Sequence, residues 1–271
     1  MMQADTPSPP GRLAELAGFI AALDACILNV EALADRPRPI VLPTYNGTRR
    51  LPNLTALLAL LLRRYGVPVL LHGPANQGSE FGRVGTAAVL RELGIEPAGS
   101  VRAVEQRLAT EGIAYAPLSL LAPGLGGLLA ARQTLGLRSS AHALARLIDP
   151  FGGMGVRVVG VSDSESSTQM REFLAATRAD ALLLRGTEGE PFANPRRQPR
   201  LEWFDRGVAT VLFEAESEAL TPPPALPATI DAPTIAEWIA GALAGLRPVP
   251  APILNELACC MHATRRIPAL A

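Results

Sequence analysis

Apolar positions along the chain follow two patterns that alternate. Short unbroken apolar runs are typical of strands buried on both faces, whereas apolar residues repeating every three or four positions are typical of helices that pack on one side. The short runs predict strands over 40–42, 67–71, 115–117, 156–161 and 181–184, with weaker β structure over 201–213.

The longer segments between these runs predict helices. They cover 12–34, 54–64, 86–93, 101–111, 168–177, 235–246 and 253–263, and a stretch over 123–149 breaks into two helical pieces near residue 136. Buried strands that alternate with helices favour an α/β fold with a mostly parallel central sheet. The Arg-Pro-Arg-Pro segment at 36–39 predicts an extended connector between the first helical stretch and the first strand.

Composition narrows the class of protein. The chain has 271 residues, of which 48% are hydrophobic and 18% charged, as expected for a folded protein. Its 25 basic residues balance 25 acidic ones, and all the basic residues are arginine. The absence of lysine excludes a P-loop lysine and a Schiff-base lysine. The longest clean apolar run, Leu54 to Leu62, is too short to span a membrane, and no signal-peptide pattern opens the chain, so we expect a cytoplasmic protein without a membrane partner.

Several kinds of site are disfavoured by the residues present. Three cysteines and three histidines, without metal-ligand spacing, argue against a zinc site, and no G-x-S-x-G motif marks a serine hydrolase. The glycine clusters at 124–127 and 152–155 do not follow a strand and open a helix, as a dinucleotide fingerprint does. We interpret both clusters as turns.

The loop between the first predicted strand and the next helix is a candidate phosphate site. Asn46, Gly47 and Thr48 follow the strand, and Asn53 and Thr55 open the helix. Backbone amides at a helix N-terminus suit a phosphate group. Asn53 could equally serve only as the helix cap, and the sequence leaves both readings open.

Positive charge gathers in two acid-free stretches. The residues from 36 to 79 and from 191 to 201 hold nine arginines and no acid: Arg36, Arg38, Arg49, Arg50, Arg63, Arg64, Arg196, Arg197 and Arg200. These clusters favour a basic groove that binds nucleic-acid phosphates. The alternative is a set of solvated arginines at the ends of loops and helices.

Two carboxylates, Glu188 and Glu190, follow the predicted strand over 181–184. Active-site residues of α/β folds gather after such strands, and paired carboxylates can hold Mg²⁺ through water. The same turn would also suit an ordinary protein surface.

Four blocks of sequence resemble the anthranilate phosphoribosyltransferase superfamily, glycosyltransferase family 3, and in particular a YbiB-like branch that departs from the transferase motifs. They are PTYNGTRRLPNLTALLALLL from Pro43, GVPVLLHGP from Gly66, LGLRSSAH from Leu135 and LLLRGTEGEPFANP from Leu182. The resemblance implies a remnant of a small helical domain, with its connector, over 1–38. It also implies an α/β domain of the nucleoside phosphorylase and phosphoribosyltransferase type over 39–271, and a homodimer. It also implies a longer helical region before Pro43 than this chain carries.

The resemblance places a phosphoribosyl pocket at Asn46, Gly47, Thr48, Asn53, Thr55, His72, Gly73 and Arg138, with Glu188 and Glu190 as the metal pair. The chain departs from the pattern at several of these places. Its loop has one glycine and no aspartate where the family has G-T-G-G-D. Leu71 and Pro74 replace the lysine and asparagine of K-H-G-N, and His142 stands where an asparagine is usual.

The departures remove the tight glycine turn and a cation that would contact the diphosphate. The resemblance to the YbiB-like branch implies nucleic-acid binding through a basic groove, and the arginine clusters favour the same function. We therefore expect a nucleic-acid-binding protein, on single or double strands and without strong base specificity, that needs no cofactor for binding. The alternative is a Mg²⁺-dependent glycosyl or phosphoribosyl transferase that uses phosphoribosyl diphosphate. A third reading is an enzyme remnant that serves as a structural dimer. The sequence identifies no catalytic residue.

Overall fold

The computed structural model of this protein describes residues 18, 22, 26–74, 82–135 and 144–264. Within these residues seven strands form one sheet in the order β3-β2-β1-β4-β5-β6-β7. The strands are β1 (Ile40–Pro43), β2 (Val69–Gly73), β3 (Ile113–Pro117), β4 (Val156–Val161), β5 (Ala181–Arg185), β6 (Leu201–Asp205) and β7 (Val208–Phe213). The first five strands of the chain pair in parallel, and β6 and β7 join as antiparallel strands. The predicted α/β class with a mostly parallel sheet is confirmed.

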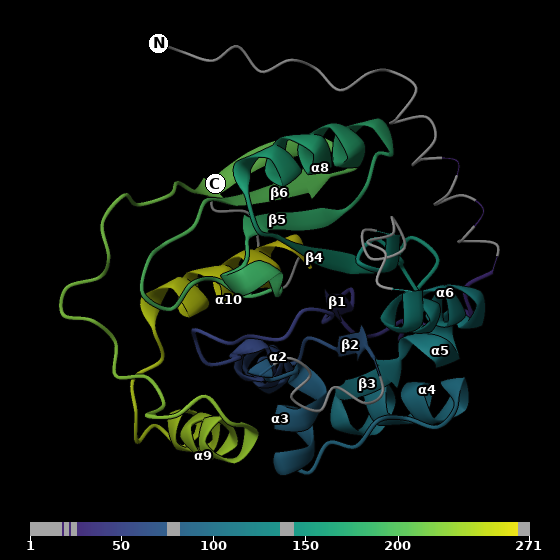
Figure 1. Cartoon of the computed structure of the whole chain (residues 1–271). Helices are drawn as coiled ribbons and strands as arrows, with labels where there is room; N and C mark the ends of the chain where they lie inside the picture. The colour runs from purple at the N-terminus through teal and green to yellow at the C-terminus, as the bar shows by residue number, and fades with distance from the viewer. Residues whose placement is uncertain (1–17, 19–21, 23–25, 75–81, 136–143, 265–271) are drawn as a thin grey trace.

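Helices cover both faces of this sheet (Figure 1). One apolar layer contains α2 (Thr55–Arg64), α3 (Thr86–Glu92), α9 (Ala232–Leu243) and α10 (Ala251–Ala263). The other contains α4 (Val101–Glu111), α5 (Leu118–Leu121), α6 (Pro123–Leu135) and α8 (Ser164–Ala176). Successive side chains of one strand point to opposite faces of the sheet, so Leu42 packs in the first apolar layer and Val41 in the second. This explains why the strands read as continuous apolar runs.

Most helices lie within three residues of the predicted bounds, although the short helix α5 was not predicted. Two further differences have a physical explanation. Helix α8 begins four residues before the predicted start, because the side chain of Asp163 accepts a hydrogen bond from the Ser166 amide and caps the helix. The predicted helix over 12–34 is wrong in its last part, since residues 28–33 are extended or irregular. There the amides of Leu28 and Val30 bond to the carbonyls of Leu121 and Pro150, so tertiary hydrogen bonds outweigh the helical pattern. Most of residues 1–25 lie outside the described part, and the proposed boundary at residue 38 stays a prediction.

The strand order creates one special position at the carboxyl ends of the parallel strands. The chain passes from β1 to β2 on one side of β1, whereas β4 pairs with its other side. The loops that leave β1 and β4 therefore diverge, and the crevice between them is where α/β proteins with this topology bind ligands.

A buried carboxylate ties helix α10 to the segment that follows β5. Glu256 is fully buried, and one of its oxygens accepts a hydrogen bond of 2.7 Å from the Ala193 amide. The other oxygen, Oε1, has no hydrogen-bond partner among the described residues. Burial raises the pKa of Glu256 from 4.5 to about 8.

We predict that Glu256→Gln stabilises the protein at pH 8 but not at pH 4. The unfolded chain releases the Glu256 proton near pH 4.5 and the folded protein only near pH 8. The carboxyl group therefore costs no stability below pH 4.5, and its cost grows as the pH rises to 8. At about 1.4 kcal/mol for each pKa unit, the gain at pH 8 reaches about 4 kcal/mol. Urea denaturation from pH 4 to pH 9 measures it, with the exposed Glu92→Gln as control. A pH-independent difference would contradict the prediction.

Candidate functional site

The loop after β1 is folded back against the start of α3. Thr48 and Val84 form an isolated antiparallel bridge, with both amides donating to the opposite carbonyls. Gly47 has a φ of +61°, and a Cβ there would lie 2.9 Å from the Val84 carbonyl oxygen. The loop thus requires glycine at this position for both its backbone conformation and its close approach to another strand-like segment.

Glu190 supplies the hydrogen-bond acceptors beneath this loop. Its Oε1 accepts from the amides of Asn46 and Gly47 at 2.6 and 3.0 Å. Its Oε2 accepts from the Thr86 hydroxyl at 3.1 Å, and the side chain is fully buried. Burial raises the pKa of Glu190, and the bonds from the two amides and the charge of Arg146 oppose that rise.

Glu188 occupies the outer half of the same loop. Its Oε1 accepts from the amides of Arg49, Arg50 and Leu51 at 2.8 to 3.2 Å. Arg83 lies 3.3 Å from Oε2. The 3₁₀ turn η2 (Thr187–Gly189) that carries Glu188 holds it at a φ of +53°, which a residue other than glycine seldom adopts. Five backbone amides of one short loop therefore point at two carboxylates.

This arrangement changes the interpretation of the two glutamates. They lie together after β5, as the sequence predicts, but their oxygens accept hydrogen bonds from N–H groups and face an arginine. Mg²⁺ prefers oxygen ligands and retained waters, and donors around the carboxylates compete with it. No group of three or more His, Cys, Asp or Glu residues that could hold a metal occurs among the described residues. The metal pair stays a prediction.

Asn53 has a structural role at the start of α2. Its side-chain oxygen accepts from the Thr55 amide, and its amide group donates to the Val84 carbonyl and the Thr86 hydroxyl. These bonds fix the helix start to the start of α3. The neighbouring Thr55 hydroxyl is buried and has no partner among the described residues.

His72 lies at the end of β2, fully buried beside Tyr45. The Tyr45 hydroxyl lies 2.7 Å from Nδ1, and burial lowers the pKa of His72 to about 3. Burial also raises the pKa of Tyr45. The other ring nitrogen of His72, Nε2, has no partner among the described residues. The adjoining Gly73 is tightly enclosed, since a Cβ would lie 2.2 Å from the Thr44 carbonyl oxygen.

Unpartnered polar atoms concentrate at this edge of the sheet. Among the described residues eight buried side-chain atoms lack a hydrogen-bond partner, and four of them belong to the loop, the start of α2, the end of β2 and the turn η2: Thr48 Oγ1, Thr55 Oγ1, His72 Nε2 and Thr187 Oγ1. Buried polar groups are nearly always hydrogen-bonded in native proteins. Their concentration indicates that water or a polar ligand completes the site.

Two arginines that the sequence analysis missed hold the loop. The guanidinium of Arg83 donates to the carbonyls of Asn46 and Gly47, and that of Arg146 donates to the Asn46 side chain at 2.8 Å and the Gly160 carbonyl. Burial lowers the pKa of Arg146, and the charge of Glu190 opposes this. Arg83 comes three residues after Glu80 and therefore lies just outside the acid-free stretch. Arg146 lies in a segment whose apolar pattern predicts a helix. No feature of the sequence therefore singles out either arginine.

The nine predicted arginines divide between two edges of the sheet. Arg38 pairs with Asp180, just before β5, and Arg63 lies against Gly112, just before β3, so both lie at the amino edge. Arg64, which ends α2, bonds to the Leu243 carbonyl. Arg36 is exposed just before β1.

Four exposed arginines lie at the carboxyl edge together with Arg200. Arg49 and Arg50 belong to the loop, whereas Arg196 and Arg197 precede β6, whose first residue pairs with the last part of β5. Arg200 is half-buried and pairs with Glu202 and Glu214. A single face containing all nine is therefore not present. Arg138 and His142 lie outside the described residues.

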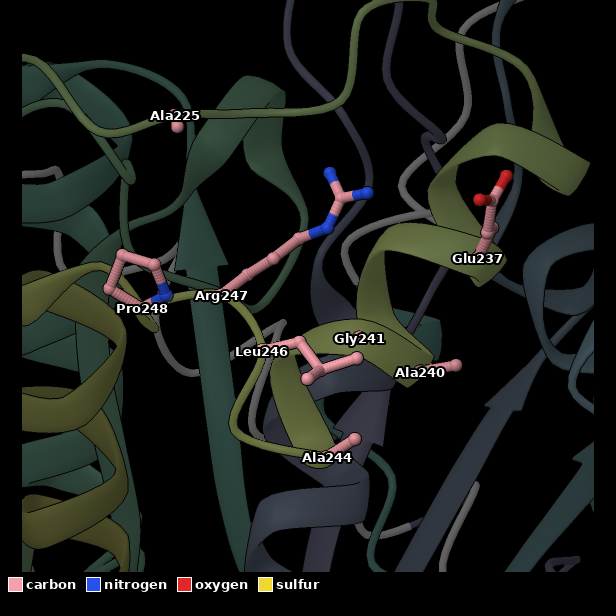
Figure 2. A pocket seen from close by; sticks show the side chains of 8 residues that line it. All are labelled: Ala225, Glu237, Ala240, Gly241, Ala244, Leu246, Arg247 and Pro248. Carbon is pink, nitrogen blue, oxygen red and sulfur yellow. The ribbon is translucent and has the colours of Figure 1, made fainter.

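Two further findings concern a cavity away from the loop and the length of the helices. A cavity of about 820 Å³ lies beside α9, where Arg247 extends along one wall, and none of the residues lining it belongs to the loop or to η2 (Figure 2). No helix in the described part of the chain is long and apolar enough to cross a membrane.

Comparison with known proteins agrees with this topology. No family model matches the chain. The Escherichia coli (strain K12) protein called uncharacterized protein YbiB is 37% identical over 252 residues, which cover 93% of this chain and 77% of YbiB. The anthranilate phosphoribosyltransferase of Frankia alni is 29% identical over 175 residues, covering 63% of this chain and 45% of the enzyme. The chain thus spans less than half of that enzyme.

Solved structures match over almost the whole chain. The anthranilate phosphoribosyltransferase of Thermus thermophilus superposes with a TM-score of 0.70 at 21% identity, covering 95% of this chain and 77% of that one. The Saccharomyces cerevisiae enzyme in complex with PRPP (phosphoribosyl diphosphate) and Mg has a TM-score of 0.67 at 16% identity, covering 94% and 71%. The fold and the loop at the strand switch thus define a phosphoribosyltransferase-type α/β protein. The similarity to YbiB goes further, and the chain belongs to the YbiB-like branch of the anthranilate phosphoribosyltransferase superfamily.

We predict that Gly47→Ala destabilises the protein more than Gly94→Ala does. Both glycines have a left-handed φ, of +61° and +77°, but a Cβ at Gly94 meets open space. The shared backbone strain costs about 1–2 kcal/mol, and the clash with Val84 adds about 1–3 kcal/mol at Gly47 only. Urea denaturation of the two variants measures the difference. Equal losses would show that the loop does not press against Val84.

Proposed function

We propose that this protein is a Mg²⁺-dependent phosphoribosyl transferase that takes phosphoribosyl diphosphate as donor. The carrying observation is the set of five loop amides, from Asn46, Gly47, Arg49, Arg50 and Leu51, that converge on carboxylate oxygens. A carboxylate is a stand-in for a phosphate group, because both are anions that accept N–H bonds. The loop residues therefore fit the charged part of such a donor.

The location of the loop supports the same proposal. It lies at the strand switch next to β1, and the relatives with similar sequence or fold include anthranilate phosphoribosyltransferases, one of them solved with PRPP and Mg. Thr48, Thr55, Thr187 and His72 each place an unpartnered buried polar atom in the elements around it. These groups would bind the hydroxyl and phosphate oxygens of the donor.

The chain would assist transfer mainly by holding the donor and by stabilising the leaving diphosphate. Without lysine, this stabilisation comes from the loop amides and from Arg83, which already faces a carboxylate. Bound Mg²⁺ would neutralise further charge on the diphosphate. Of the two glutamates Glu188 is the one that could turn toward it, because Glu190 is fully buried whereas the Glu188 side chain is 17% exposed.

We predict that Thr55→Val weakens the binding of phosphoribosyl diphosphate at least tenfold without destabilising the free protein. The Thr55 hydroxyl has no partner in the described protein, so its removal breaks no internal hydrogen bond. Replacing an unpaired buried hydroxyl with a methyl group of similar shape is neutral or stabilising. Calorimetry with Mg²⁺ measures binding, and thermal unfolding measures stability.

Thr177→Val is the matched control, because its hydroxyl bonds to the Phe173 carbonyl in α8, outside the loop and its neighbouring elements. The control should leave donor affinity unchanged. Release of diphosphate from the donor, in the presence of Mg²⁺ and a panel of aromatic amines that includes anthranilate, tests transfer itself. No donor binding and no Mg²⁺-dependent release with any acceptor would overturn the proposal.

A second candidate function, nucleic-acid binding, rests on the four exposed arginines at the carboxyl edge. Arg49, Arg50, Arg196 and Arg197 lie at the edge that also presents the loop, and a chain of phosphates could contact them. The names of the relatives reported above mention no nucleic acid. The expected homodimer likewise stays a prediction.

We predict for this second candidate that the logarithm of the association constant for a single-stranded oligonucleotide falls with the logarithm of salt with a slope of roughly −3, since four phosphates are neutralised. The double variant Arg49→Gln/Arg50→Gln should bind more weakly with a shallower slope. Arg63→Gln/Arg64→Gln, at the opposite end of α2, is the control with the same loss of charge. Fluorescence anisotropy measures both, and equal effects of the two double variants would contradict a site at the carboxyl edge.

A further inference from the structure

The carboxylate of Glu188 is held as a bound anion would be. Three consecutive amides, those of Arg49, Arg50 and Leu51, donate to its Oε1, and Oε2 faces the guanidinium of Arg83. Consecutive amides that converge on one point are a recurring way in which proteins bind phosphate. The loop therefore presents a formed anion site whose occupant belongs to the chain itself.

Glu188 differs from Glu190 in how firmly it is held. Glu190 is fully buried and bonds inward to Thr86, so it is part of the support beneath the loop. The Glu188 side chain is 17% exposed and that of Arg83 33% exposed, so solvent reaches this pair. Glu188 also stands in a left-handed backbone conformation between Thr187 and Gly189, and Gly189 has a φ of +82°.

Two unpartnered groups adjoin this carboxylate along the chain. The hydroxyl of Thr187, the residue before Glu188, is buried and without a partner among the described residues, and so is the hydroxyl of Thr48, the residue before Arg49. Thr48 and Thr187 are 0% and 3% exposed. Neither hydroxyl donates to Glu188 in the present arrangement, so displacing Glu188 breaks no hydrogen bond to either of them.

We propose that Glu188 is an intramolecular competitor that occupies a phosphate site formed by the amides of Arg49, Arg50 and Leu51 and by Arg83. A diphosphate or phosphate ester enters by displacing this carboxylate, and Arg83 changes partner from Glu188 to the ligand. This inference deepens the proposed function and rests on it, since it names the contact that regulates access to the same loop.

The replacement of the Glu188 carboxylate by an external anion, called the exchange below, explains how the site stays folded without a ligand. The amides of Asn46, Gly47 and Leu51 lie in buried or partly buried surroundings, so they need acceptors within the protein when no ligand is bound. Glu190 satisfies the inner two amides permanently, and Glu188 satisfies the outer three until an anion replaces it. The ligand must outcompete a tethered carboxylate, so its apparent affinity is lowered by the fraction of time that the site is closed.

The test compares diphosphate binding by the wild-type protein, Glu188→Gln and Glu218→Gln. Calorimetry in buffer without divalent metal uses inorganic diphosphate as the probe. Glutamine is neutral and competes poorly, so Glu188→Gln should bind diphosphate at least tenfold more tightly than the wild type. Glu218 is exposed in the segment after β7, and its variant controls for the change in net charge. Equal or weaker binding by Glu188→Gln would overturn the proposal, as would an equal gain in Glu218→Gln.

Adding Arg83→Gln to Glu188→Gln should abolish most of the gain, because Arg83 is the cation that the ligand takes over. A gain that survives this second change would place the diphosphate elsewhere. Amide chemical shifts of the wild-type protein supply a measurement that needs no variant. Saturating diphosphate should move the resonances of Arg49, Arg50 and Leu51 more than those of Asn46 and Gly47, and binding without shifts at the first three would overturn the proposal.

These results separate the exchange from the transferase activity. Tighter diphosphate binding by Glu188→Gln, without release of diphosphate from phosphoribosyl diphosphate under any condition, supports the exchange and overturns the transferase. Turnover by the wild type without any gain in Glu188→Gln overturns the exchange and leaves the transferase standing. No diphosphate binding by either protein overturns the exchange.

Discussion

The bonds from the loop amides to Glu190 are the interaction on which the site depends. They join residues 144 positions apart, from the end of β1 and from the segment that follows β5. Because the Glu190 carboxylate is buried, its oxygens need hydrogen-bond donors from the protein. The amides of Asn46 and Gly47 and the hydroxyl of Thr86 provide them. The same carboxylate thereby fixes the loop after β1, the start of α3 and the turn after β5 relative to one another.

This support has a consequence for charge at the carboxyl edge. A chain without lysine still presents amides, Arg83 and Arg146 around one short loop, and its own carboxylates balance them. Arg49 and Arg50 of the same loop are exposed, but the loop amides already have carboxylate acceptors, so these amides bind an external anion only where a carboxylate can leave. Glu188 is the carboxylate that solvent reaches, whereas Glu190 is buried. Two glutamates only two positions apart therefore differ in role: Glu190 supports the loop, and Glu188 can be exchanged for an external anion.

Sequence patterns predicted the fold better than the chemistry of the site. The apolar runs located β1, β4 and β5 almost to the residue, because both faces of these strands are buried whatever their partners are. Glu188 and Glu190 lie together after β5, as the sequence predicts, and the metal role expected of them stays a prediction. Their acceptor role could not be predicted, since the donors are backbone amides 137 to 144 residues earlier, and backbone groups leave no trace in residue type. Arg146 was missed for a similar reason, because its partner Asn46 lies 100 residues earlier and its other partner is the backbone carbonyl of Gly160.

The loop after β1 is thus an anion site that Glu188 closes and Glu190 supports. A crystal structure of the protein with diphosphate bound would test this arrangement. We expect phosphate oxygens against the amides of Arg49, Arg50 and Leu51, the Glu188 side chain turned away, and Glu190 still bonded to Asn46 and Gly47. A diphosphate bound elsewhere, with Glu188 still on the loop amides, would contradict it.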